Sequence, residues 1–305
     1  MAFEDFWWGQ ETPPAGASLR FSGSQLLTRT IAAPTSTTNF TISVWVKIAE
    51  ISNQYNGYLA SGAGPSQSFL TTAGPVAGTG SQPFWYLQNP GVTTITYTPS
   101  LRDPAAWYHL VSTSDGTGIT LYINGVNVGK AAYGGPPLLN ETGWTRYIGG
   151  GGAPFRGYMS DFFISDGLVL SPTTFGYFDA NNVWVPYAFN TAKANVISAG
   201  GFGNAGFALR FEGQYFNSGT LVWSDQSGNG NDYTANWNCA VGSGSPAMAA
   251  GTDIVNDGPT VNNNVLFPLE PSAYGGNIVF GPWPQSLYYS ANLTSGSIGN
   301  FGFQT

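Results

Sequence analysis

The sequence predicts an all-β protein in which two antiparallel sheets pack face to face. Apolar side chains recur at every second residue between Phe40 and Ile48, which is the period of a strand with one buried face. Glycine (42 residues) and proline (20) are abundant, while charged residues make up only 8 % of the chain. A composition so rich in turn formers and so poor in charge is typical of β proteins.

The clearest strand signal lies between residues 106 and 129. Two runs of alternating residues, 107–112 and 119–123, flank the turn formers Asp115–Gly118. The next turn is Asn124–Gly125, a strong hairpin signal because a type I′ turn needs left-handed backbone at both central residues. This stretch therefore predicts an antiparallel meander of three strands.

Weaker alternation and turn residues predict the other elements. Further strands are expected over 19–31, around Tyr58 and Phe69, over 84–88 and 92–98, over 146–149 and over 157–164. Ser171–Pro172 predicts a single helical turn, with serine as the N-cap and proline at the first position. No other helix is expected.

Four short motifs occur along the first half of the chain. They are S-L-R-F-S-G at 18–23, F-T-I-S-V-W-V at 40–46, W-Y-H-L-V with L-Y-I-N-G-V in the central meander, and G-Y-M-S-D-F-F-I at 157–164. In type and order they resemble the laminin-G-like modules of the concanavalin A-like lectin superfamily, over roughly residues 15–178. The resemblance implies a jelly-roll β-sandwich for this part.

Changes in composition suggest where the sandwich ends. The segment A-L-R-F-E-G at 208–213 repeats the L-R-F-x-G of the opening strand, after a stretch rich in Asn, Ala and Gly. A second, smaller β-rich C-terminal region is therefore expected. The expected parts are an aromatic N-terminal tail (1–16), the laminin-G-like sandwich (17–178), a linker (179–206) and the C-terminal region (207–305).

Charge and cysteine content exclude several classes of protein. The net charge is −7 with only nine Lys and Arg residues, which excludes nucleic acid as the partner because phosphate binding depends on basic side chains. A single cysteine, Cys239, allows no intrachain disulfide and fits assembly in a reducing cytosol. The start has no apolar signal-peptide core, and no apolar run approaches ~18 residues, so we expect neither a secretory signal nor membrane insertion.

The acidic and histidine residues argue against an enzyme. Glycosidases with a retaining mechanism need two carboxyl groups about 5 Å apart, and no glutamate here has a second acid two residues later. His109 is the only histidine, so it is either a packed strand residue or part of a Ser-His-Asp triad; we expect the former. Because the chain has one His and one Cys, a metal site built from several His or Cys ligands is ruled out.

One loop presents oxygen side chains at alternate positions around a glycine, as calcium loops do. The calcium candidates are Asp225, Ser227, Asn229 and Asp232. The glutamate expected at the twelfth position of an EF-hand loop is replaced by Asn236. The alternative is an Asx-Gly turn that bonds its own backbone. Apart from calcium, no cofactor is expected.

Aromatic residues supply the candidates for ligand and partner binding. Planar rings can stack on sugars, although core packing is the alternative for each of them; the carbohydrate-binding candidates are Trp45, Trp85, Tyr86 and Trp144. The tail aromatics need an apolar surface, either on a neighbouring protein or on the chain's own sandwich. The partner-docking candidates are Phe3, Phe6, Trp7 and Trp8.

A segment near the C-terminus indicates a biological setting. Residues 253–268, D-I-V-N-D-G-P-T-V-N-N-N-V-L-F-P, resemble a segment of structural proteins of tailed bacteriophages that carry laminin-G-like sandwiches. The resemblance implies a non-enzymatic virion protein, made in the host cytoplasm and displayed on the virion surface, as a tail fibre, a head fibre or a capsid decoration. Expected partners are other virion proteins, further copies of the chain and a host or environmental glycan. The alternatives are a free carbohydrate-binding lectin and a divergent glycoside hydrolase or lyase.

Overall fold

The computed structural model describes most of the first 237 residues. The described residues are 18–22, 25–49, 56–63, 66–73, 82–88, 92–96, 101–104, 106–132, 141–150, 155–211, 214–217, 220–237 and 254–255. They form two large antiparallel sheets, a two-stranded hairpin and two short helices.

The first large sheet, sheet I, has eight strands within the described residues. In order across the sheet they are β10 (Val126–Ala132), β9 (Gly118–Ile123), β8 (Tyr108–Asp115), β3 (Asn39–Ile48), β12 (Arg156–Asp166), β1 (Ser18–Ser22) and β19 (Ile254–Val255), with β15 (Phe207–Leu209) also pairing with β12. The expected meander is confirmed as β8, β9 and β10. Asn124 (φ 48°) and Gly125 (φ 79°) both adopt the left-handed backbone that its second turn requires.

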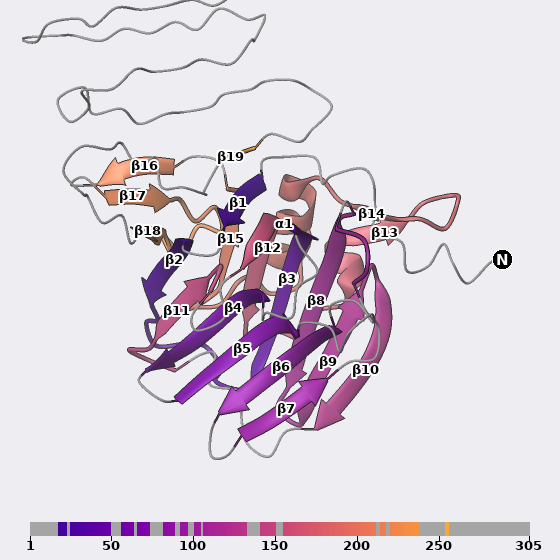
Figure 1. Ribbon diagram of the computed structural model, residues 1–305, viewed down its shortest axis with the longest axis horizontal. Coiled ribbons are helices and arrows are strands. Elements are labelled where there is room, and N and C mark those ends of the chain that lie inside the picture. Colours follow the sequence, from indigo (N-terminus) through magenta and orange to yellow (C-terminus); the bar gives the residue numbers. More distant parts are fainter. Residues whose placement is uncertain are drawn as a thin grey trace, which may run out of the picture.

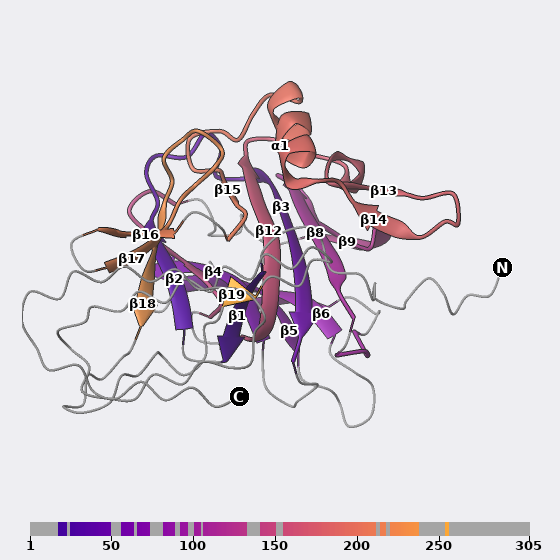
Figure 2. The ribbon, with the colours of Figure 1, turned by 90° about the horizontal axis from the view of Figure 1, so that it is seen from above.

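The second large sheet, sheet II, has nine strands within the described residues. In order they are β16 (Gln214–Asn217), β17 (Thr220–Trp223), β18 (Tyr233–Trp237), β2 (Gln25–Thr30), β11 (Thr145–Ile148), β4 (Asn56–Ala63), β5 (Ser66–Ala73), β6 (Gln82–Gln88) and β7 (Val92–Thr96). Figures 1 and 2 show the two sheets stacked face to face. The predicted all-β sandwich is therefore confirmed.

The main core lies between the two sheets. Ile42, Val44 and Val46 of β3 are fully buried there, as the alternation of that strand predicts. Trp223 and Tyr233 also belong to this core, although they come from the part of the chain expected to form a separate region. The sandwich therefore needs residues from both halves of the sequence.

Sheet I is covered on its outer face as well. Thr41, Ser43 and Trp45, which point away from the main core, are at most 2 % exposed. They are covered by residues 168–206, which we call the covering segment. It contains η1 (Pro172–Thr174), β13 (Gly176–Phe178), β14 (Trp184–Pro186) and α1 (Phe189–Ser198). Figure 2 shows these elements on the side of sheet I away from sheet II.

The helical content differs from the expectation at one place. The turn at Pro172–Thr174 is confirmed, with Ser171 Oγ accepting a hydrogen bond from the Thr173 N–H. The expectation of no other helix is wrong, because α1 follows at Phe189–Ser198. Its N-cap, Ala188, makes no side-chain cap bond, so the usual start signal is missing. Packing of Phe189, Ala192 and Val196 on sheet I stabilises it instead.

The chain beyond residue 178 is not divided as expected. Residues 179–206 form part of the covering segment rather than a linker, and the strands of 207–237 complete the sandwich. β15 pairs with β12 and β18 pairs with β2. Both L-R-F copies reach β12: β1, which holds the first copy, pairs with it on one side of its bulge at Ser160–Phe163, and β15, which ends at Leu209 of the second copy, pairs with it on the other side.

Candidate functional site

Two turns define the opposite ends of sheet I. The turn at Asp115–Gly118 joins β8 to β9, and the turn at Asn124–Gly125 joins β9 to β10. At the first end, Asn39 pairs with Asp115, so the loop 31–38 that enters β3 lies beside this turn. We call the turn, this loop, Lys130 and Trp144 the loop rim.

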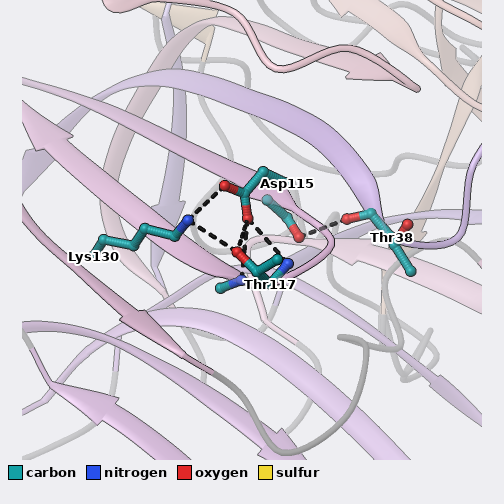
Figure 3. Close-up of polar contacts among 6 residues, drawn as sticks. Thr38, Asp115, Thr117 and Lys130 are labelled. Atoms are coloured by element: carbon teal, nitrogen blue, oxygen red, sulfur yellow. Dashed lines mark hydrogen bonds and ion pairs between the residues drawn. The ribbon is translucent and has the colours of Figure 1, made fainter.

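The centre of the loop rim is a charged network around Asp115, shown in Figure 3. Lys130 Nζ donates to Asp115 Oδ2 (2.5 Å) and to Thr117 Oγ1 (3.0 Å). Asp115 Oδ1 also accepts from Thr117 Oγ1 (2.7 Å) and from the Thr117 and Gly118 N–H groups. The bonds from Lys130 and Thr117 hold the pKa of the Asp115 carboxyl well below its usual value. The carboxylate is therefore ionised near neutral pH.

The loop 31–38 is fixed in place next to this network. Asp166 accepts hydrogen bonds from the N–H groups of Thr35 (2.6 Å) and Ser36 (3.0 Å), and Ser114 Oγ donates to the Thr38 carbonyl (2.5 Å). Trp144 connects to the start of this loop, because its carbonyl accepts from the Ile31 N–H (2.8 Å). These bonds hold the backbone of the loop in a fixed arrangement.

The groups at the loop rim suit recognition of polar, uncharged ligands. The side chains of Lys130 and Asp115 are 45 % and 39 % exposed, so they can exchange their mutual bonds for bonds to hydroxyl groups. Trp144 is half-buried, and its backbone bond to Ile31 places it at the start of the loop 31–38, whereas the charged network lies beside the end of that loop. Sequence reasoning did not identify Asp115 and Lys130, although the predicted meander would have brought both to the same end of the sheet.

The four carbohydrate-binding candidates lie in different places. Trp144 lies at the loop rim. Trp45 is 2 % exposed and stacks on His109, so its ring is inside the protein, which matches the core-packing alternative. Its burial results from the covering segment, which alternation within β3 does not reveal. Trp85 and Tyr86 are neighbours in β6. The structure describes the backbone of this strand but not their side chains.

An aromatic anchor lies at the other end of sheet I. The His109 ring is fully buried between Trp45 (centroids 4.7 Å apart, planes at 13°) and Trp184 (5.9 Å, 14°). Trp184 Nε1–H donates to His109 Nδ1 (3.0 Å), and Ser43 Oγ lies 2.8 Å from Nε2. Because an indole N–H can only donate, Nδ1 carries no proton and Nε2–H donates to Ser43.

The environment of His109 identifies it as a structural residue. Burial lowers its pKa to about 3, so the ring is neutral in the folded protein near neutral pH. Both ring nitrogens are used in hydrogen bonds, as expected for a packed strand histidine. Gly125 lies directly under the Trp184 ring, where an added Cβ would collide with it. His109 and Gly125 together hold the β13–β14 hairpin on the sheet.

The candidate calcium loop bonds mainly to backbone groups. Asp225 is 8 % exposed, and its carboxylate accepts from the N–H groups of Ala208, Ser227 and Asn231 at 2.8–2.9 Å and from Ser227 Oγ at 2.7 Å. Asp232 Oδ1 accepts from the Asp225 N–H, and the Asn229 amide donates to two carbonyls. These bonds match the Asx-turn alternative.

We expect calcium to leave the stability of this loop unchanged. A bound ion would have to replace hydrogen bonds that the Asp225 carboxylate already makes. Thermal unfolding curves recorded with calcium and with EDTA should therefore coincide. A calcium-dependent rise in melting temperature that is lost in Asp232→Asn would instead support a metal site. Within the described residues, no group of three or more His, Cys, Asp or Glu side chains is placed to hold a metal ion.

Two other expectations concern the N-terminal tail and membrane insertion. The partner-docking candidates Phe3, Phe6, Trp7 and Trp8 lie outside the described residues. Among the helices that the structure describes, none has both the length and the apolarity to span a membrane.

The fold and the rim together define a lectin-like β-sandwich. The model of the concanavalin A-like lectin/glucanases superfamily matches residues 21–174. The chain belongs to this superfamily. The β13–β14 hairpin and α1 lie beyond the matched residues.

Several solved structures are similar to the chain. A heptameric SAP-like pentraxin from Limulus polyphemus is 15 % identical, with 52 % of this chain and 78 % of that chain covered and a TM-score of 0.42. A putative carbohydrate binding protein from Bacteroides ovatus is 18 % identical (73 % and 59 % covered, TM-score 0.46). The enzymatically active domain of tailspike protein 2 from bacteriophage CBA120 is 14 % identical (51 % and 26 % covered, TM-score 0.41). No curated protein sequence matches the chain.

Proposed function

We propose that this chain is a non-enzymatic virion structural protein of a tailed phage, and that its sandwich binds host or environmental glycans at the loop rim. The observation that carries the glycan proposal is the exposed network of Asp115, Thr117 and Lys130. Charged donors and acceptors can bond sugar hydroxyls, while the Trp144 indole at the rim can stack on a sugar ring. The lectin-like fold is consistent with this role.

The bonding of three of the described aspartates supports a role without catalysis. Asp166, Asp179 and Asp225 each accept hydrogen bonds from two or more backbone N–H groups. A carboxylate held in this way stabilises a loop and is not positioned to protonate a glycosidic oxygen. Release of reducing sugar from a host polysaccharide, abolished by changing one acid, would contradict this part of the proposal and favour a divergent glycoside hydrolase.

The virion role is supported by the resemblance of residues 253–268 to a segment of tailed-phage structural proteins. It is tested by mass spectrometry and antibody labelling of purified particles, together with the solution mass of the isolated protein. We expect the protein on the particle surface and a mass that corresponds to several copies. A monodisperse monomer that never occurs on particles would contradict the virion role and favour a free lectin.

Glycan binding should depend on Lys130 and Trp144. We expect Lys130→Ala and Trp144→Ala each to weaken binding on a glycan array by about tenfold or more, which corresponds to ~1.4 kcal/mol. Lys47→Ala is the matched control, because Lys47 lies near the far end of β3 from the rim, and it should bind like the unchanged protein. Since an exposed ion pair contributes little to stability, Lys130→Ala should keep its melting temperature.

The array also decides whether glycan binding occurs at all. A flat array with and without a chelator would contradict glycan binding and leave the virion role to the particle experiment. Binding that persists in both rim variants would contradict the rim as its location.

A further inference from the structure

The outer face of sheet II, which is turned away from sheet I, is not covered in the way that the outer face of sheet I is. Thr28, Tyr147 and Thr234 lie on this face and are partly exposed. Their strand neighbours Leu27 and Ile148 face the main core and are at most 1 % exposed. Figure 1 looks onto this outer face, with strands β4 to β7 in front of sheet I.

One row of paired residues crosses all nine described strands of sheet II on this face. The register pairs Thr28 with Thr234 on one side and with Tyr147 on the other. From β16 to β7 the whole row is Tyr215, Val222, Thr234, Thr28, Tyr147, Ala60, Phe69, Tyr86 and Thr94. We call it the aromatic row, because aromatic residues and threonines make up most of it.

The register also separates the neighbouring candidates Trp85 and Tyr86. Tyr86 belongs to the aromatic row. Trp85 belongs to the next row, in which it pairs with Leu70 and Leu70 pairs with Leu59. Leu59 is fully buried in the main core. Because successive residues of a strand lie on opposite faces, Trp85 is on the core face and Tyr86 is on the outer face.

The aromatic row carries no charged residue, and neither does the row beside it on the same face. Four members of this second row are Thr30, Thr145, Gly62 and Gln67. Threonine hydroxyls both donate and accept hydrogen bonds, and aromatic rings present flat apolar surfaces. A neutral ligand that is rich in hydroxyl groups complements both features.

The arrangement of the row fits an elongated sugar ligand better than a protein. Tyr147 and Tyr86 are three strands apart in the sheet order, which is about 14 Å at ~4.8 Å per strand. A protein partner with an apolar surface would bury the threonine hydroxyls without new hydrogen bonds, which is unfavourable. Sugar hydroxyls supply those bonds while the sugar rings lie on the aromatic residues.

We propose that the outer face of sheet II binds a neutral polysaccharide chain along the aromatic row, with Tyr147 and Tyr86 as its aromatic contacts and Thr28 among its hydrogen-bonding groups. This surface is separate from the network of Asp115 and Lys130. The proposal therefore goes beyond glycan binding at the loop rim.

Affinity electrophoresis of the full chain tests this surface. Native gels contain dextran, galactomannan or hydroxyethyl cellulose as neutral polymers, or polygalacturonate as the charged comparison. We expect at least one neutral polymer to retard the protein, and Tyr147→Ala and Tyr86→Ala each to weaken this binding about threefold to tenfold. No retardation by any neutral polymer, or retardation by polygalacturonate alone, would overturn the proposal.

Three further variants locate the binding on the outer face. Trp85→Phe changes the core-face neighbour of Tyr86, and Tyr177→Ala removes a tyrosine that is 42 % exposed in the covering segment; both should be retarded like the unchanged protein. Thr28→Arg places a long charged side chain in the row without removing a ring, and it should weaken binding severalfold. Unchanged retardation of Thr28→Arg, or equal losses in Trp85→Phe and Tyr86→Ala, would contradict the proposed surface.

The variant Lys130→Ala separates this proposal from glycan binding at the loop rim. Its retardation by the neutral polymer should equal that of the unchanged protein, whatever its effect on the glycan array. Loss of retardation in Lys130→Ala would overturn the sheet II surface and leave the rim proposal in place. Conversion of an oligomer to a monomer by Thr28→Arg, with unchanged retardation, would show that this face is a contact between copies and would also overturn the proposal.

Discussion

Replacing Trp184 by alanine is expected to lower the free energy of unfolding by about 3–5 kcal/mol. Trp184 is 3 % exposed, packs on Trp45 and Trp107 in one cluster, and donates the hydrogen bond to His109 Nδ1. The substitution leaves a cavity and removes the hydrogen bond to the buried acceptor His109 Nδ1, and both effects destabilise the fold. Urea unfolding followed by circular dichroism measures the change.

Two companion variants separate the contributions to this loss. Tyr177→Ala lies in the same hairpin but is 42 % exposed, so it should cost less than about 1 kcal/mol. Trp184→Phe keeps an aromatic ring and removes the donor, and it should cost about 1–3 kcal/mol. Equal stability of Trp184→Ala and Tyr177→Ala would show that the anchor does not hold the covering segment.

Acid is expected to destabilise the protein through His109. The pKa of this ring is about 3 in the folded protein, whereas an unfolded histidine titrates near 6.5. Between these values the unfolded chain binds a proton that the folded chain does not bind, so stability falls as the pH falls. The contribution is complete above pH ~6.5 and decreases by about 1.4 kcal/mol per pH unit below it, to a maximum loss of about 4–5 kcal/mol near pH 3.

The comparison with His109→Gln isolates this effect from the titration of carboxylates. Glutamine can accept from Trp184 and donate to Ser43 but does not titrate, so its free energy of unfolding should depend less steeply on pH between 6 and 4. Urea unfolding at a series of pH values gives both slopes. Parallel slopes for the two proteins would contradict a neutral, buried His109.

Local patterns predicted most of the sandwich. The meander from Tyr108 to Ala132 was predictable because its turns need left-handed backbone, which Asn124 and Gly125 supply. Helix α1 was not, since it has no side-chain cap and depends on packing against sheet I. The partnership of β2 with β18 was equally hidden, because strand pairing between distant segments leaves no local signal.

The candidate site could be predicted less well, for a related reason. Trp45 alternates with the core residues of β3, and that pattern normally indicates an exposed side chain. Whether its face of the sheet meets solvent depends on the covering segment, more than 120 residues further along the chain. Asp115 and Lys130 meet only through the register of the meander, so each residue looks ordinary on its own.

The pairing of β2 with β18 has a consequence for how the protein folds. Thr28 lies opposite Thr234, 206 residues away in sequence. On the ribosome, β2 emerges long before the strand that completes its edge, so sheet II cannot close until nearly 240 residues have been synthesised. Pairings this distant make folding slow, on a timescale of roughly milliseconds to seconds or longer. The unfinished edge of β2 is therefore the place where nascent chains are most exposed to association with one another.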